Sequence, residues 1–301
     1  MLVIAGLAAL GTLVGFLGRV SWAGELASHF RAHYFLALTT AAVFLLCSHR
    51  PQEAALASAF VLINGLLIAP VYGRRAPVVP SELFRALSAN LWIYNHSYEQ
   101  VRRFLREANA DLVILQEVTE AWRQALGDVI AEYYCADAEP FPRGFGVFVL
   151  SRAPIERTEI ARSGSAILPS VIVRIRLHGK PVTVIGAHPR SPTSPARARR
   201  RNWQLAELAG VVQRQEGPVL VMGDLNTTSW SDAFQRFLRA TRLRDSRRGF
   251  GLQPTWPAQI PWLRIPIDHC LVSPEIIVHR RQVGRRIGSD HLPIVVDFSL
   301  G

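Results

Sequence analysis

The sequence contains little cysteine. Its three cysteines, Cys47, Cys135 and Cys270, are odd in number and widely separated in a chain of 301 residues. No CxxC pair is present, so the sequence predicts neither a disulfide framework nor a cysteine-based zinc site. We interpret the thiols as structural or incidental, and their scarcity does not fix the redox compartment.

Lysine is almost absent. Lys180 is the only one, so nearly all of the 34 basic side chains are arginines. We attribute this bias to genome base composition rather than to function. The net charge is nevertheless +11, which favours anionic partners such as nucleic acid, phospholipid headgroups or phosphate esters.

Several catalytic signatures are also missing. The sequence has no G-x-S-x-G elbow, which argues against a serine hydrolase, and no P-loop for nucleotide phosphates. It has no internal repeat and no low-complexity segment. Any hydrolytic chemistry must therefore come from other side chains.

Long apolar runs, by contrast, are concentrated near the N-terminus, at residues 1–18, 34–48 and 54–73. A bilayer core of about 30 Å needs roughly 20 apolar helical residues, a length that only the third run reaches. We predict a transmembrane helical region over residues 1–75 with about three spans. A signal peptide in the first run and a buried helical domain are the alternatives.

Basic residues around these runs suggest an orientation. With three spans, Arg19, Arg31, Arg74 and Arg75 lie on one side and Arg50 lies on the other. The positive-inside rule then predicts that the C-terminal domain is cytoplasmic.

The composition changes after residues 74–82, "RRAPVVPSE", which we interpret as a linker. Short strand-like runs alternate with helical patterns from there, and Ser231 is a plausible helix N-cap. The sequence therefore predicts a layered α/β domain over residues 80–301.

Polar residues follow or precede many of these strands. They are Asn90, Glu117, His188, Asp224, Asn226, Asp268, Asp290 and His291. Their recurrence predicts one site at one edge of a sheet. Such an oxygen-rich set suits Mg²⁺ or Mn²⁺, with a carboxylate to activate water and a histidine to protonate a leaving group. These groups suffice for hydrolysis of a phosphate ester.

Six segments carry a family resemblance: "SANLW", "LVILQEV", "GAHPRSP", "VMGDLN", "IDHCLVS" and "GSDHLPIVV". Their order over residues 84–300 resembles the endonuclease/exonuclease/phosphatase superfamily, with deoxyribonuclease- and sphingomyelinase-like features. The apolar N-terminus resembles that of membrane-anchored bacterial members, which implies a multi-pass protein of the inner membrane. The resemblance implies a four-layer α-β-β-α sandwich that hydrolyses phosphodiesters with Mg²⁺ or Mn²⁺.

The resemblance also implies metal-site residues. Glu117 resembles the principal metal ligand, Asn90 the asparagine that supports the metal or its water, and Asp290 a further metal-site carboxylate.

Catalytic roles follow from the same resemblance. Asp224 resembles the residue that activates water, and Asn226 the one that holds the phosphate. His291 resembles the histidine beside the scissile phosphate, with Asp268 as its orienting carboxylate. His188 resembles a second histidine, which leaves the leaving-group acid open between His188 and His291.

The substrate stays open at this stage between a nucleic acid and a phospholipid headgroup. Phe145 stands where abasic-site endonucleases typically have a tyrosine, which argues against that activity. The arginines at 197–201 are either a phosphate contact or a solvated helix face. A catalytically inactive phosphate- or nucleic-acid-binding module, or a regulatory domain of a membrane protein, are the alternatives to an enzyme. No protein partner is evident.

Overall fold

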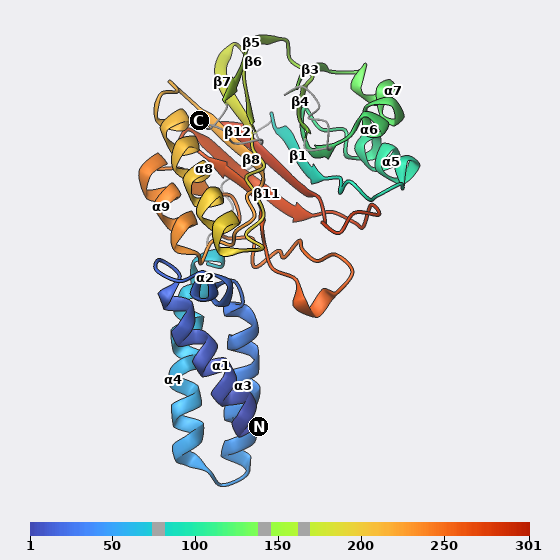
Figure 1. Cartoon of the computed structure of the whole chain (residues 1–301). Helices are drawn as coiled ribbons and strands as arrows, with labels where there is room; N and C mark the ends of the chain where they lie inside the picture. The colour runs from blue at the N-terminus through green and yellow to red at the C-terminus, as the bar shows by residue number, and fades with distance from the viewer. Residues whose placement is uncertain (74–81, 138–145, 162–168) are drawn as a thin grey trace.

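The computed structural model describes residues 1–73, 82–137, 146–161 and 169–301. Residues 74–81 of the linker predicted at 74–82 lie outside these residues, and so does Phe145. Figure 1 shows a bundle of helices from the N-terminal region standing below a layered domain of sheets and helices. The predicted domain bounds, 1–75 and 80–301, remain predictions.

All three apolar runs are helical. They form α1 (Leu2–Val14) with η1 (Gly15–Leu17), α3 (Arg31–Cys47), and α4 (Pro51–Ile68) with η2 (Ala69–Val71). The sequence did not predict α2 (Trp22–Ser28), a short helix capped by the hydroxyl of Ser21, which accepts from Gly24 N at 3.3 Å.

Length and composition separate these helices as candidate membrane spans. Only Pro51–Val71 is long and apolar enough by itself among the described residues, while α2 and α3 would qualify together despite a bend of 65°. The segment Leu2–Leu17 is apolar but shorter. One described helix thus has the length and composition of a span, and the predicted three spans remain a prediction.

The layered domain contains two six-stranded sheets, which confirms the predicted α/β class. The first has the order β11-β12-β1-β2-β4-β3 and the second β5-β6-β7-β8-β10-β9. The strands of the first sheet are β11 (Ile276–Val283), β12 (Ile294–Leu300), β1 (Phe84–Asn90), β2 (Leu112–Val118), β4 (Gly146–Ser151) and β3 (Tyr134–Asp137). Those of the second are β5 (Ile155–Ala161), β6 (Ser170–Leu177), β7 (Lys180–Gly186), β8 (Val219–Asp224), β10 (Asp268–Val272) and β9 (Arg244–Asp245).

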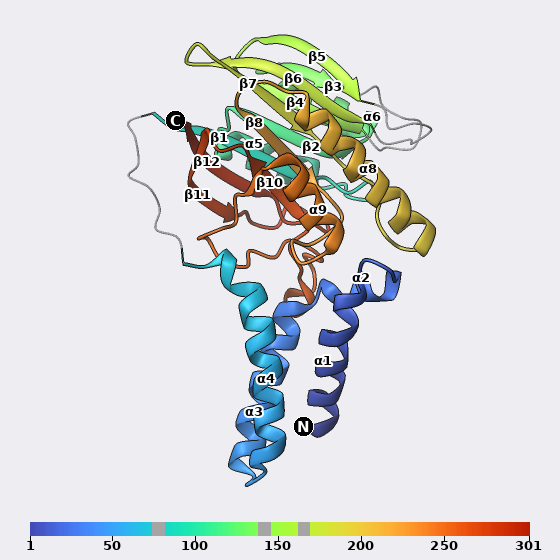
Figure 2. The same cartoon turned by 90° about the vertical axis from the view of Figure 1, so that its left-hand side faces the viewer.

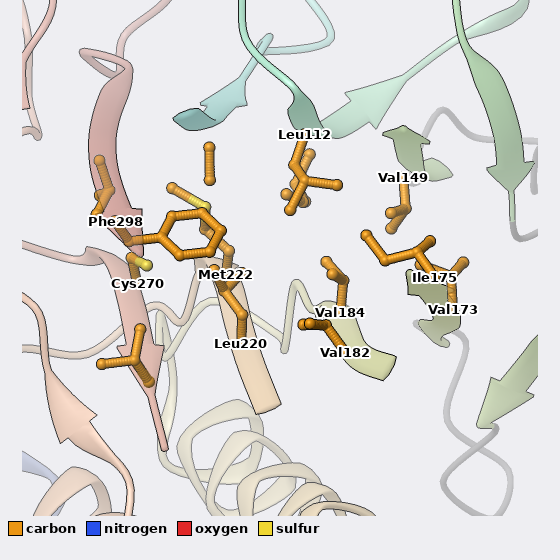
Figure 3. Close-up of a cluster of buried hydrophobic side chains, with 14 of the residues drawn as sticks. Leu112, Val149, Val173, Ile175, Val182, Val184, Leu220, Met222, Cys270 and Phe298 are labelled. Carbon is orange, nitrogen blue, oxygen red and sulfur yellow. The ribbon is translucent and has the colours of Figure 1, made fainter. Parts of the chain in front are cut away.

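The two sheets pack face to face over an apolar core. Figure 3 shows side chains from both sheets meeting there, including Leu112 and Phe298 from the first and Val184, Leu220 and Met222 from the second. Alternating strand residues supply this layer, because successive side chains point to opposite faces. Cys270 of β10 is also buried there, and burial raises the pKa of its thiol to about 12, which supports a structural role.

Helices cover the outer faces. Apolar side chains of the first sheet pack against α5 (Tyr98–Ala108), α6 (Glu120–Ala125) and α7 (Gly127–Ile130). Apolar side chains of the second sheet pack against α8 (Pro195–Gln213) and α9 (Asp232–Thr241). The result is the α-β-β-α order that the resemblance implied (Figure 2). Ser231 is the N-cap of α9, as predicted, and accepts from Phe234 N at 3.2 Å.

Strand pairing determines where the polar residues meet. Parallel β1 and β2 carry Asn90 and Glu117 to one edge of the first sheet, and β8 carries Asp224 to the edge of the second. The sequence predicts Asp268 at the end of a strand, but in the structure Asp268 is the first residue of β10. Since β10 is antiparallel to β8, Asp268 pairs with Asp224 and reaches the same edge. The site is therefore built by both sheets, and the prediction of a single sheet edge was wrong.

The helical region contacts the layered domain through polar groups as well as apolar ones. The indole nitrogen of Trp22 donates to Pro192 O at 2.8 Å, and that of Trp230 donates to Leu67 O at 3.1 Å. Gly249 N donates to Val71 O at 3.0 Å. The two regions are thus joined at several points along one boundary.

Candidate active site

A cavity of about 870 Å³ lies where the sheet edges face the helical region. Six of the eight candidate residues line it: Glu117, His188, Asp224, Asn226, Asp290 and His291. The other two, Asn90 and Asp268, are buried directly behind and hydrogen-bond to lining residues. Segments spread over two hundred residues therefore meet in one place.

Asp224 lies at the centre of this group. Its Oδ1 accepts from Asn226 N at 2.8 Å, and its Oδ2 lies 3.5 Å from His188 Nε2 and 3.7 Å from His291 Nε2. Burial alone would raise the pKa of Asp224, but the two imidazoles and these hydrogen bonds lower it below its ordinary value. Asp224 is thus held as a carboxylate.

The residue before Asp224, Gly223, must be a glycine for a structural reason. Gly223 has a φ of +148°, and a Cβ there would collide with the backbone of Ala187. Only glycine lets β8 approach the end of β7 this closely. That approach places Asp224 beside His188.

Asn90 connects the two carboxylates. Its Nδ2 donates to Glu117 Oε1 at 3.1 Å and to Asp224 Oδ2 at 3.2 Å, while its Oδ1 accepts from Trp92 N at 2.9 Å. Glu117 has a left-handed φ of +57°, and its Oε2 accepts from Ile93 N at 3.0 Å. Such a conformation is uncommon outside glycine and marks a position constrained by its surroundings.

His291 and Asp268 form a buried pair. His291 Nδ1 lies 2.9 Å from Asp268 Oδ2, and the backbone nitrogen of His291 donates to Ser289 Oγ at 3.0 Å. Burial alone would lower the pKa of His291, but the carboxylates of Asp268 and Asp224 outweigh it and raise this pKa to about 10. His291 is therefore an imidazolium at neutral pH.

His188 approaches the carboxylates from the end of β7. Its Nε2 also lies 3.8 Å from Glu117 Oε1, and its Nδ1 is buried without a hydrogen-bond partner among the described residues. Burial alone would lower the pKa of His188, but Asp224 and Glu117 raise it above its ordinary value. The two carboxylates thus favour the protonated form of His188, which lines the cavity.

Asn226 and Asp290 differ in what they offer a ligand. Asn226 Nδ2 donates to Pro189 O at 3.0 Å and to Asp224 Oδ2 at 3.2 Å, so its amide positions Asp224 rather than facing the cavity freely. Asp290 Oδ2 accepts from Trp256 Nε1 at 3.0 Å, and its buried Oδ1 has no recorded partner within the described part of the chain.

These donors fit a hard divalent cation. Burial, first of all, raises the pKa of Asp290, and the nearby charges of Glu117 and Asp224 raise it further, which is the electrostatic state that a cation would relieve. Ligand atoms of Asp224, Asp268 and His291 also lie within 4.8 Å of one another. One oxygen of Asp268 in this group is hydrogen-bonded to His291, and the carboxylates of Glu117 and Asp290 line the same cavity.

The sequence reasoning missed one buried ion pair beside the site. Arg201 of α8 is fully buried, pairs with Glu25 of α2, and donates to the carbonyl oxygen of Asn226. The available signal was Glu25, a carboxylate in an otherwise apolar stretch. Of the remaining arginines in the 197–201 run, Arg197 lines the cavity, whereas Arg199 and Arg200 are exposed.

A two-sheet sandwich with carboxylates and histidines gathered at its edge defines a class of hydrolase-like proteins. The sequence pattern of the Endonuclease/Exonuclease/phosphatase family matches residues 87–291. The chain therefore belongs to this family, which confirms the resemblance drawn from its motifs.

Solved structures agree on the fold. Humanized D. rerio TDP2 is 16% identical with a TM-score of 0.61, covering 72% of this chain and 99% of that one. An endonuclease/exonuclease/phosphatase from Beutenbergia cavernae is 19% identical with a TM-score of 0.58, covering 73% and 72%. D. rerio TDP2 complexed with single strand DNA product is 16% identical with a TM-score of 0.61, covering 73% and 100%. No curated protein sequence matches the chain significantly.

Proposed function

We propose that this protein hydrolyses phosphodiesters by attack of water, with Mg²⁺ or Mn²⁺ as cofactor. The observation that carries the proposal is the convergence of Glu117, Asp224 and His291 on one cavity, together with His188 and Asp290. The complex of D. rerio TDP2 with single strand DNA product supports a phosphodiester as the general substrate.

The chain's own groups can move the necessary protons. The carboxylate of Asp224 takes a proton from water as the water oxygen bonds to phosphorus and the bond to the leaving oxygen breaks. The imidazolium of His291, with a pKa of about 10, keeps its proton at neutral pH and neutralises charge on the phosphoryl oxygens. His188 then donates the proton that the leaving oxygen needs.

A bound cation, held by Glu117 and Asp290, would polarise a phosphoryl oxygen and stabilise the departing oxyanion. Asn90 positions both Glu117 and Asp224 through its amide group. Asp268 orients His291. Asn90 and Asp268 thus act through other residues, which explains why they lie behind the cavity rather than in its wall.

The test is turnover of bis-p-nitrophenyl phosphate by the full chain, with and without a chelator. Glu117→Gln should reduce kcat/KM by about a thousandfold, because it removes a ligand charge while keeping shape. Glu120→Gln, on the exposed surface of α6, is the matched control and should act like the wild type. Equal turnover in the wild type and Glu117→Gln would favour the inactive binding module instead.

We also propose that the helical region is embedded in a bacterial inner membrane. Leu7, Leu36 and Leu62 are more than 60% exposed on its outer surface, which water would not favour but lipid would. The segment that joins α1 to α3, with Arg19 in it and Arg31 directly after it, lies at the end of the bundle nearest the layered domain, and the turn between α3 and α4, which contains Arg50, lies at the far end (Figure 1). This distribution supports a cytoplasmic catalytic domain.

A further inference from the structure

The helical region supplies one wall of the catalytic cavity. Trp22 and Leu26 of α2, with Phe30 at the start of α3, line the same cavity as Asp224 and His291. The cavity thus has a polar end at the sheet edges and an apolar wall contributed by the N-terminal helices.

Other parts of the lining extend this apolar character. Ile93 follows β1, and Ile265 and Ile267 precede β10; all three face the cavity. Aliphatic side chains of this kind pack well against hydrocarbon chains.

The wall is fixed in place by polar contacts. Glu25, between Trp22 and Leu26 on α2, is paired with buried Arg201, and His29 Nδ1 lies 3.0 Å from Thr228 Oγ1. Both partners belong to the catalytic domain. The apolar wall is therefore a built part of the site, held in register with the catalytic groups.

The same end of the molecule faces the predicted membrane surface. The side chain of Trp262 is 75% exposed, Leu263 beside it is 44% exposed, and the backbone of Trp262 contacts His33 at the start of α3. Exposed tryptophan next to apolar helices is typical of the membrane–water boundary. The catalytic cavity thus opens beside helices that have apolar outer surfaces.

From these contacts we infer that the substrate is a lipid phosphodiester whose hydrocarbon chain lies against Trp22, Leu26 and Phe30. This inference rests on the proposed phosphodiesterase function. The phosphate lies at the polar end, and Arg190 and Arg197 add positive charge to the lining. The hydrocarbon chain points towards the helical region. The lipid therefore enters the cavity, and is cleaved, at the end of the helical bundle that contacts the layered domain.

A series of chromogenic diesters tests the inference on the detergent-solubilised full chain. Methyl, octyl and dodecyl p-nitrophenyl phosphates share one leaving group and differ only in the alkyl chain. We expect kcat/KM to rise at least tenfold from methyl to octyl, because burial of each methylene favours binding. A single-stranded DNA oligonucleotide and phosphatidylglycerol in mixed micelles complete the panel.

Wall variants locate the effect. Leu26→Ala and Phe30→Ala should each lower the octyl-to-methyl ratio of kcat/KM at least threefold. An unchanged far-UV circular dichroism spectrum and an unchanged elution volume in size-exclusion chromatography show that the variants fold. Leu36→Ala, on the outer surface of α3, is the control and should leave the ratio unchanged.

The outcomes separate the two proposals. A ratio independent of chain length, a ratio unaffected by both wall variants, or faster cleavage of the oligonucleotide than of phosphatidylglycerol would overturn the lipid inference alone. Absence of Glu117-dependent turnover with every ester would instead overturn the proposed function.

Discussion

The two regions of the chain place their leucines in opposite environments. In the layered domain, Leu112 and Leu220 are fully buried between sheets. In the helical region, Leu36 and Leu62 are 68% and 63% exposed, while the buried interior includes the polar contact from Asn64 Nδ2 to Thr12 Oγ1 at 2.8 Å. The same residue type thus faces inward in one region and outward in the other, which supports the proposal that the helical region lies in a membrane.

The boundary between the two regions contains buried charged side chains. Glu25 and Arg201 form an ion pair there with almost no exposed surface on either side chain. Burying two charges is costly unless they satisfy each other, so we expect the pair to fix the position of α2 on the layered domain. Three perturbations test the contrast between the regions and this boundary.

The largest expected effect comes from Glu25→Ala. It leaves the guanidinium of Arg201 buried without its carboxylate and should lower the free energy of unfolding by about 3–5 kcal/mol. Chemical unfolding of the detergent-solubilised chain measures this. The double variant Glu25→Leu with Arg201→Met should recover most of the loss.

Glu156→Ala provides the matched control, since it removes an exposed ion pair with Arg176 and should cost less than about 1 kcal/mol. If Glu25→Ala and the double variant were equally destabilised, the buried pair would not determine how the regions dock.

The next effect tests the outward-facing leucines. Leu62→Arg places a charge in the middle of Pro51–Val71, a helix long and apolar enough to span a membrane, and should raise the free energy of membrane insertion by about 2.5–3.5 kcal/mol. The measurement is the fraction of protein that stays in the membrane pellet after an alkaline carbonate wash. Glu207→Arg, on the exposed face of α8, should not change that fraction. An unchanged pellet for Leu62→Arg would contradict the membrane proposal.

The smallest effect concerns pH at the boundary. Burial lowers the pKa of His29 to about 4 from an ordinary value of 6.5, so the folded state binds this proton less well than the unfolded state. Stability from neutral His29 is complete above pH 6.5 and falls by about 1.4 kcal/mol per pH unit until about pH 4. His188 and His291, with raised pKa values, contribute with the opposite sign.

The difference between wild type and His29→Gln isolates this contribution. Glutamine can still hydrogen-bond to Thr228 but does not titrate. The unfolding free energy of the variant should therefore fall less steeply than that of the wild type as the pH is lowered from 6.5 to 5.5. Parallel curves for the two proteins would show that His29 does not titrate differently on folding.

Much of the layered domain was predictable because its strands combine apolar runs with turn residues. β2 and β8 are clear examples. β5 was missed because its sequence, "IERTEIA", is largely exposed and shows no apolar run. β11 was not predicted because its arginines interrupt the apolar pattern. One of them, Arg281, is buried and donates to Asp268 O at 3.1 Å. Periodicity cannot reveal strands whose polar side chains find partners elsewhere in the fold.

The candidate site shows a similar division. Motif order identified all eight residues that the structure brings together, but it could not assign their individual contacts. Asn226 was expected to hold phosphate, whereas its amide bonds to Asp224 and Pro189. The apolar wall could not be predicted, because nothing in the sequence relates Trp22 or Leu26 to Asp224 across two hundred residues. Only the docking of α2 makes that connection.

The inclusion of both Trp22 and His291 in one cavity lining has a consequence for biosynthesis. A ribosome synthesises the segment around Trp22 long before it synthesises His291. The complete lining of the cavity can therefore form only late in synthesis, and a chain truncated before residue 291 would lack part of it.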